Sequence, residues 1–404
     1  MPVKGRLICQ LIVLTSIAAL ASCRSPYWQP EVHFSDGSPK TIVGVKELLA
    51  KPTTEQVDVV TIHGMCTHDR KWANDAINDL AARLGDFTKS DIDPISVKKS
   101  NAQVFKRSIE YNGKTVNISA LVWSPILTPL KSNLCYDQKN KTGLCARGDK
   151  KPSFLAKPID APAFEEERAI ANRLGKDTLL DDCLADAMIY QGKARDEISK
   201  QVQEAILFAA LPDKQTLEPE IVREEAAKRT KVPLVIFTSS LGSKVGFDAL
   251  NALRKNEGKD EAATGATVIR TVNIFMAANQ WPILQLADQD LSPGSGAAGL
   301  VARPHDSLQE LLGKYQGEMN AFQAGLMNEA SGRTPSVIVL SDPNDILSYS
   351  WRNSPSRPDY VTVDVVVSNE KTWLNLFENP GTAHKGYLDQ PHIADMVMDG
   401  YHGR

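Results

Sequence analysis

The sequence predicts an α/β fold with a mostly parallel central sheet and helices on both faces. Four apolar runs rich in β-branched residues are typical of strands buried on both sides, at residues 57–62, 232–237, 335–340 and 361–367. Segments with helical periodicity separate these runs, which indicates crossover connections between parallel strands. With 404 residues, the chain is long enough for one large core with an insertion.

The other elements follow from the same patterns. We expect helices at residues 70–84, 193–211, 307–327 and 391–400, and strands at residues 115–123 and 266–276. Residues 277–287 could line a substrate pocket or equally pack in the core.

A long connection, at about residues 124–192, is rich in Pro, Lys and Asp. We expect two helices within it, at about 162–174 and 179–190. We interpret it as a cap-like insertion at the carboxyl edge of the sheet, where ligands bind in α/β proteins. It could cover the site as a lid or only decorate its rim.

Ser240 lies at a predicted strand-to-helix turn. The strand 232–237 precedes it, Gly242 follows two residues later, and residues 244–253 have helical periodicity. A serine at such a turn exposes its oxygen, and the helix N-terminus directs backbone N–H groups at the same point. Serine-rich turns also serve as helix caps and phosphate sites, so catalysis needs further support.

The segment Thr238-Ser-Ser-Leu-Gly242 resembles the Gly-x-Ser-x-Gly nucleophile elbow of the α/β-hydrolases. Thr238 departs from the pattern, because it replaces the first glycine. The resemblance implies an α/β-hydrolase domain over residues 57–404, with Ser240 as the nucleophile and Gly242 supporting the turn. Ser239 fits less well, because Leu241 rather than a glycine lies two residues beyond it.

The strand 57–62 runs into His63-Gly64-Met65, which resembles the loop that builds the hydrolase oxyanion hole. By this resemblance, the backbone N–H groups of Met65 and Leu241 face the developing oxyanion. Gly64 lets the backbone approach the substrate closely. We expect His63 to shape the loop rather than to act in catalysis.

His68 and Asp69 follow in the same loop and could suggest a metal pair. Two ligands at loop spacing are too few for a zinc site. We therefore expect no metal, and no cofactor is implied.

An acidic turn follows the predicted strand 335–340. The triad acid of the hydrolases lies just after a late strand, and Asp345 matches that position better than Asp342. Asp342 follows the strand directly and could instead cap the turn through its own backbone.

His384 lies on a predicted loop after the last strand, in Ala-His-Lys-Gly-Tyr, which resembles the triad-histidine loop of the family. His392, at the start of the terminal helix, is the weaker candidate. The order Ser240, Asp345, His384 is that of the α/β-hydrolases. The resemblance implies that His384 accepts the Ser240 proton and that Asp345 orients the imidazole, with an acyl-enzyme intermediate.

The N-terminus resembles a bacterial lipoprotein signal peptide, with a basic start, an apolar stretch, and Leu-Ala-Ser before Cys23. We expect residues 1–22 to be removed and Cys23 to carry lipid, with residues 23–56 forming a tether and edge strand or strands. Ordinary secretion is the alternative. Arg24, rather than aspartate, after the cysteine favours the outer membrane, with the protein facing the periplasm.

Four cysteines remain for the folded domain in an oxidising compartment. Cys135 and Cys145 flank a short polar loop and are the expected disulfide. A bond between Cys66 and Cys183 would tie the oxyanion loop to the insertion, but these two could also remain buried thiols.

The formal net charge is −3, and no basic patch with interleaved aromatic residues is apparent, so nucleic acid is not an expected partner. The expected function is a membrane-anchored serine hydrolase that cleaves small-molecule or lipid esters, like esterases and lipases. The alternatives are an amidase, peptidase or acyltransferase with the same triad, or a catalytically silent envelope binding protein on a hydrolase scaffold.

Overall fold

The computed structural model describes residues 29–35, 40–85, 87–137, 144–145, 168–288, 306–328, 334–352, 359–369 and 378–403. The predicted signal peptide, residues 1–22, and the predicted lipid-attachment residue Cys23 lie outside these ranges. In the described part, no helix is both long and apolar enough to cross a membrane.

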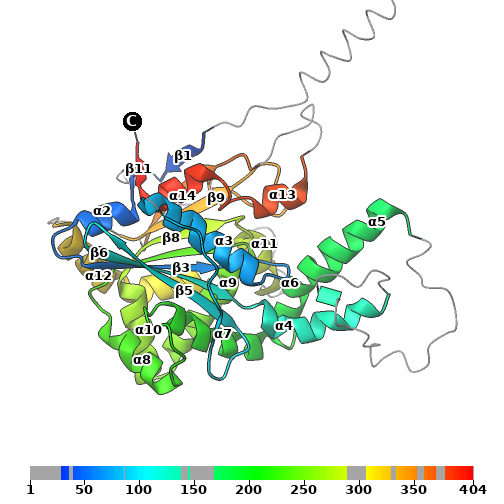
Figure 1. The fold of residues 1–404 in the computed structure, drawn as a ribbon, viewed down its shortest axis with the longest axis horizontal. Coiled ribbons are helices and arrows are strands. Elements are labelled where there is room, and N and C mark those ends of the chain that lie inside the picture. The colour runs from blue at the N-terminus through cyan, green and yellow to red at the C-terminus, as the bar shows by residue number, and fades with distance from the viewer. Residues whose placement is uncertain are drawn as a thin grey trace, which may run out of the picture.

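A mixed sheet forms the centre of the described structure (Figure 1). Its order is β1-β10-β9-β8-β7-β3-β6-β5-β4. The strands are β1 (Glu31–Phe34), β3 (Gln56–Ile62), β4 (Ile95–Ser96), β5 (Gln103–Tyr111), β6 (Lys114–Val122), β7 (Leu234–Ser239), β8 (Thr271–Ala277), β9 (Ser336–Ser341) and β10 (Val361–Val366). From β10 to β6 all neighbours are parallel, whereas β1, β5 and β4 pair antiparallel at the edges.

Helices cover both faces of this sheet (Figure 1). One face carries α2 (Val45–Ala50), α3 (Arg70–Ala81) and α14 (Pro391–Met398). The other carries α7 (Arg195–Ala209), α8 (Pro219–Lys228), α9 (Leu241–Lys255), α10 (Lys259–Ile269) and α12 (Ser307–Met327). A small second sheet pairs β2 (Thr41–Val43) with β11 (Gly400–His402). The molecule is thus an α/β protein with a mostly parallel sheet between two helical layers, as predicted.

The strand order reverses direction beside β3. After β3, the chain adds β6 on one side of it, whereas β7 and the later strands lie on the other side. Ligands of α/β proteins bind in the crevice outside the carboxyl ends of the strands at such a switch point. The segments that leave β3 and β7 at this point are those around His63 and Ser240.

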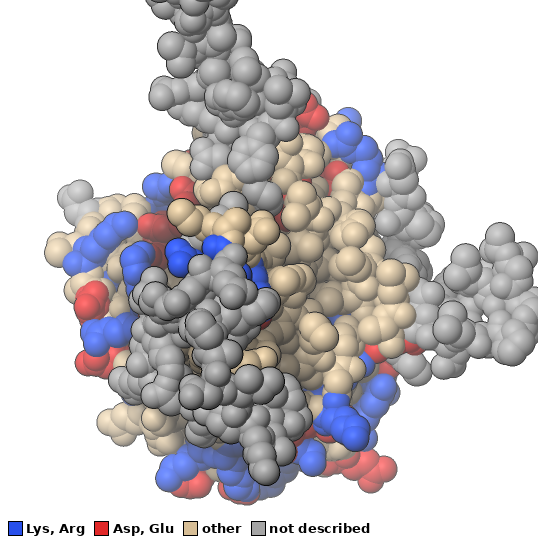
Figure 2. All heavy atoms as spheres, turned by 90° about the vertical axis from the view of Figure 1, so that its right-hand side faces the viewer, with Lys and Arg blue, Asp and Glu red and all other residues tan. Residues whose placement is uncertain are grey.

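The insertion lies beyond the carboxyl ends of the parallel strands (Figure 1). It contains α4 (Ser124–Lys131), α5 (Ile170–Leu174) and α6 (Ala185–Tyr190), and a π-helical stretch, Gly175–Leu184, joins the last two. The predicted interruption between two helices near residue 175 is therefore wrong, and residues 162–167 of the predicted helix 162–174 lie outside the described residues. Seen from this side, charged side chains gather mainly toward the rim of the face (Figure 2).

Two further boundaries differ from the prediction. The strand expected at 266–276 begins only at Thr271, because the preceding β-branched run completes α10. There the Thr267 hydroxyl donates to the Ala263 carbonyl at 2.8 Å, a bond that fits a helix. His384, expected on a loop, lies on the short helix α13 (Pro380–Lys385).

Candidate active site

Ser240 occupies a sharp turn between β7 and α9. Its backbone has φ 52° and ψ −130°, an unusual conformation for a residue with a side chain. Its N–H donates to the Ala277 carbonyl of β8 at 2.7 Å, which holds the turn against the sheet. Such strain costs about 1–3 kcal/mol and persists only where the surroundings enforce it, often at functional sites.

Two glycines allow the turn and the loop after β3 to touch. A Cβ at Gly64 would lie 2.6 Å from the Ser240 Cβ, and one at Gly242 would lie 2.2 Å from the His63 carbonyl oxygen. Atoms cannot approach so closely without contact strain, so both positions require glycine unless the backbone moves. The predicted supporting residues Gly64 and Gly242 therefore meet at Ser240.

Thr238 fills the place where the elbow pattern has glycine. Its hydroxyl lies 2.8 Å from the Ser243 hydroxyl and donates to the Phe275 carbonyl of β8 at 3.1 Å. The side chain is fully buried. The larger residue is thus accommodated because its hydroxyl bridges the elbow strand, the next strand and α9.

The structure brings Ser240, His384 and Asp345 together in one hydrogen-bonded chain. The Ser240 Oγ lies 3.1 Å from His384 Nε2. On the other side of the ring, His384 Nδ1 lies 2.9 and 3.0 Å from the two carboxylate oxygens of Asp345. Because the carboxylate accepts from Nδ1–H, Nε2 is left as the acceptor of the Ser240 hydroxyl.

Asp345 is held by two further donors. It accepts the N–H of Leu347 at 3.0 Å and the phenol of Tyr387 at 3.1 Å. Tyr387 also accepts the N–H of Asp342 at 2.8 Å. Burial raises the pKa of Tyr387 well above its ordinary value, with the Asp345 charge adding to the rise, so the phenol remains a donor.

Asp342, the alternative acid, has a different environment. Its carboxylate accepts the N–H of Asn344 at 2.8 Å and the N–H of Asn369 at 2.6 Å. Burial raises its pKa. Asp342 therefore joins the turn after β9 to the segment after β10, while Asp345 is the aspartate that contacts His384.

His63 shapes the loop after β3. Its Nε2 accepts the N–H groups of Trp123 at 2.9 Å and Ser124 at 3.1 Å, so Nδ1 carries the proton and donates to the Gly64 carbonyl at 2.7 Å. The ring is fully buried and stacks on Trp123 with 5.1 Å between the ring centroids. Burial, aided by the nearby His68, lowers its pKa well below 6.5, so the ring is neutral.

The two predicted oxyanion donors are the backbone N–H groups of Met65 and Leu241. Leu241 is the first residue of α9, so its N–H belongs to the first turn, where helical N–H groups lack intrahelical acceptors. Gly64, in contact with Ser240, places Met65 beside the same turn. Both side chains are buried.

His68 and Asp69 have structural partners of their own. Asp69 caps α3 by accepting the N–H groups of Lys71 and Trp72. His68 Nδ1 lies 2.9 Å from the Cys66 carbonyl, and burial lowers the His68 pKa to about 4. Within the described ranges, the one cluster with metal-ligand spacing is Cys66, Asp182 and Cys183. Its two sulfurs are joined in a disulfide and offer no thiolate.

A cleft of about 490 Å³ opens at Ser240 and His384. It extends along α3, whose side of the cleft carries several charged side chains. The charged residues that line it are Asp69, Lys71, Asp75, Asp79, Lys385 and Asp389. Burial and the like charges of Asp79 and Asp75 raise the pKa of Asp389. Residues 277–287, the alternative pocket wall, are not among the residues that line this cleft.

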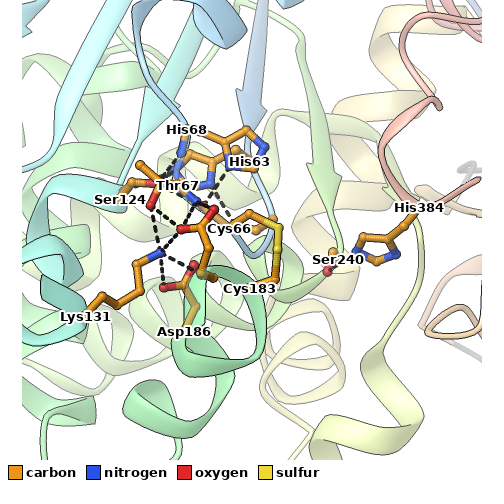
Figure 3. The surroundings of a disulfide bond; sticks show 12 residues. His63, Cys66, Thr67, His68, Ser124, Lys131, Cys183, Asp186, Ser240 and His384 are labelled. Carbon is orange, nitrogen blue, oxygen red and sulfur yellow. Dashed lines mark hydrogen bonds and ion pairs between the residues drawn. A yellow bond between two sulfur atoms is a disulfide. The ribbon is translucent and has the colours of Figure 1, made fainter. Parts of the chain in front are cut away.

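Two disulfides are present among the described residues. Cys135–Cys145 confirms the predicted pair. Cys66–Cys183 joins the loop after β3 to the insertion across 117 residues of sequence, as the open alternative suggested (Figure 3).

Sequence reasoning assigned no role to Tyr387, Trp123 or Ser124. Tyr387 follows His384 by three residues, and this spacing could have indicated that the two side chains lie close together. The contacts of Trp123 and Ser124 with His63 have no sequence signature, because they depend on β6 lying beside β3. Comparisons of this chain with protein-family models, with curated proteins and with solved structures found no match.

Proposed function

We propose that this protein is a serine hydrolase of the α/β-hydrolase type that cleaves carboxylic esters. The observation that carries the proposal is the chain from Ser240 through His384 to Asp345, with Ser240 on a strained turn that lines the cleft. A nucleophile, a base and an orienting carboxylate at these separations are the parts that acyl transfer through an acyl-enzyme requires.

The reaction would proceed in two halves. Ser240 Oγ attacks the ester carbonyl carbon while His384 Nε2 takes the hydroxyl proton, and Asp345 stabilises the resulting imidazolium. The N–H groups of Met65 and Leu241 donate to the oxyanion of the tetrahedral intermediate. His384 returns the proton to the leaving alcohol, and a water molecule then hydrolyses the acyl-enzyme by the same steps.

Fluorophosphonate labelling of the purified mature protein tests this proposal directly. We expect a single modified residue, Ser240, when the adduct is mapped by mass spectrometry, and loss of labelling in Ser240→Ala. Ester turnover should fall at least about 10⁴-fold in the same variant. Ser239→Ala is the matched control, because Ser239 is the neighbouring hydroxyl and should keep most activity. A folded wild-type protein that neither labels nor hydrolyses esters would overturn the proposal.

The cellular site belongs to the same proposal. The motif before Cys23 supports removal of residues 1–22, lipid attachment at Cys23 and anchoring at the bacterial outer membrane, with the protein facing the periplasm. Glu31 pairs with Val366 at the carboxyl end of β10, so the chain enters the sheet at the edge where the cleft lies. Radiolabelled palmitate should enter the wild-type protein and not Cys23→Ser. Equal labelling of the two proteins would exclude Cys23 as the lipidated residue.

A further inference from the structure

The loop after β3 turns sharply at Cys66, the residue next to Met65. Cys66 has φ 75°, in the left-handed region that residues with a side chain rarely adopt. Because this turn sets how the chain leaves Met65, it also sets the direction of the peptide groups around the proposed oxyanion donor. A residue with a side chain keeps such a conformation only where its surroundings enforce it.

The disulfide with Cys183 supplies a covalent restraint at this point. Cys183 lies on the helical stretch of the insertion that leads into α6. Cys66 and Cys183 are both buried. The insertion is thus bonded to the residue that follows Met65, and Figure 3 shows this bond together with Ser240 and His384.

A polar cluster fastens the next residue of the loop to the same part of the insertion. The Thr67 N–H donates to the Asp182 carboxylate at 3.1 and 3.2 Å, and the Thr67 hydroxyl donates to it at 2.5 Å. Lys131, whose side chain is fully buried, donates to the Thr67 hydroxyl and to Asp182, each at 2.9 Å, and pairs with Asp186 at 2.9 Å. The cluster docks the loop on the insertion, and the disulfide is the covalent bond within that contact.

The loop has a second support from Ser124, the first residue of α4. The Ser124 hydroxyl donates to the Cys66 carbonyl at 3.2 Å and accepts the His68 N–H at 2.9 Å. The Cys66 carbonyl also lies 2.9 Å from His68 Nδ1, so hydrogen bonds hold the peptide group that follows Cys66, whereas the disulfide holds its side chain. Opening the disulfide therefore removes the covalent restraint on Cys66 and leaves only these hydrogen bonds.

We propose that the Cys66–Cys183 disulfide positions the Met65 N–H for the oxyanion, so that turnover requires this bond to be oxidised. The inference rests on the proposed function of Ser240, His384 and Asp345. With the bond reduced, Cys66 relaxes toward an ordinary conformation and the Met65 donor is misplaced, while the hydrogen-bonded chain from Ser240 to Asp345 is unaffected.

The redox state of Cys66 and Cys183 would determine where in the cell the enzyme works. Reduction by a dithiol transfers two electrons and two protons, leaving Cys66 and Cys183 as thiols and the dithiol as its own disulfide. Thiols stay reduced in the bacterial cytoplasm, whereas disulfides form after export. The chain would therefore gain its full esterase activity only once it has reached the envelope.

The second disulfide offers a matched control. Cys135–Cys145 also lies in the insertion and is also buried, but its cysteines are ten residues apart and neither belongs to the loop of Met65. We compare Cys66→Ala/Cys183→Ala with Cys135→Ala/Cys145→Ala in the purified mature protein, using a soluble p-nitrophenyl ester. Each protein is also examined by thermal unfolding.

We expect kcat of Cys66→Ala/Cys183→Ala to fall about 100-fold, as for loss of one oxyanion donor, with KM changed little. The pH profile of kcat/KM should keep its shape, because the triad is intact. The Cys135→Ala/Cys145→Ala protein should keep kcat within about threefold even where its melting temperature falls. Equal kcat in both double variants, or a loss that appears in KM alone, would overturn the inference.

If Cys66→Ala/Cys183→Ala does not fold, the role of the disulfide is tested on the wild-type protein. Wild-type protein is titrated with dithiothreitol, and the open pair is identified by alkylation and mass spectrometry. Activity should fall as Cys66 and Cys183 become alkylated and return on reoxidation. Constant activity after this pair has opened, or loss that comes only with global unfolding, rejects the role. If oxidised wild-type protein itself lacks activity while folded, the proposed function fails instead.

Discussion

Gly64 has no side chain, and this allows the loop after β3 to pack directly against Ser240. Gly64→Ala would place a Cβ 2.6 Å from the Ser240 Cβ and must push the elbow or the loop aside. We expect esterase activity to fall at least about 100-fold, because a displacement of about 1 Å in a catalytic group has effects of this size.

The control for this prediction is Gly317→Ala in α12, where an added Cβ meets nothing within 4 Å. Alanine should stabilise that helix by about 0.5–1 kcal/mol and leave activity unchanged. Enzyme assays and denaturant melts of both variants check the pair. Full activity of Gly64→Ala would mean that the contact with Ser240 is not needed.

Replacing each aspartate in turn by asparagine distinguishes the roles of Asp345 and Asp342. Asp345→Asn removes the carboxylate that orients His384 and should lower kcat by about 10³–10⁴-fold while the fold persists. Asp342→Asn should lower stability modestly and leave kcat within about tenfold, because its partners are backbone N–H groups of Asn344 and Asn369. The reverse result, measured by steady-state kinetics, would make Asp342 the triad acid.

At the scale of elements, α4 and α6 meet through a buried ion pair. Lys131 lies 2.9 Å from Asp186, whose burial raises its pKa to about 6 despite this contact. Lys131→Met would leave the carboxylates of Asp186 and Asp182 without their cation. We expect the free energy of unfolding to fall by about 3–5 kcal/mol at neutral pH.

The pH dependence of this loss has a definite sign. A carboxyl group whose pKa is higher in the folded protein than in the unfolded chain stabilises the fold most at low pH, where it is protonated. For Asp186 this contribution to stability is lost as the pH rises toward about 6. The deficit of Lys131→Met should therefore be smaller near pH 4, where Asp186 is protonated, than at pH 7. Lys228→Met, which removes an exposed pair with Glu225, should leave the free energy of unfolding nearly unchanged at either pH. Urea melts at the two pH values check both, and equal deficits at both would contradict the assignment.

At the scale of the whole molecule, buried neutral histidines make folding sensitive to acid. Burial lowers the pKa of His63 well below 6.5 and that of His68 to about 4. The unfolded chain binds these protons more readily, so their contribution is present above pH 6.5 and is lost as pH falls toward 4. For His68, which is only partly buried, this loss in the free energy of unfolding is at most about 3 kcal/mol.

Comparison of wild-type protein with His68→Gln isolates this effect, since Asp186 acts in the opposite direction over part of the same range. We expect the variant to lose less free energy of unfolding between pH 6.5 and 4 than the wild-type protein does. Parallel pH profiles from denaturant melts would show that His68 does not titrate differently in the folded and unfolded states.

Much of the molecule followed from local sequence. The α/β class, the strands at β3, β7, β9 and β10, and the helix α12 were predicted, because buried strands and amphipathic helices have periodic patterns. Cys135–Cys145 was predicted because the two residues flank a short loop. The order of Ser240, Asp345 and His384 was predicted from the resemblance of their motifs to those of the α/β-hydrolases.

The tertiary structure decided what depends on neighbours distant in sequence. It selected Asp345 over Asp342 as the contact of His384, and it joined Cys66 to Cys183 across 117 residues. Local patterns specify the conformation of a segment, but they do not specify which strands lie side by side. The strand order that places β3 between β6 and β7 brought the loop of Met65, the turn of Ser240 and the insertion to one edge of the sheet.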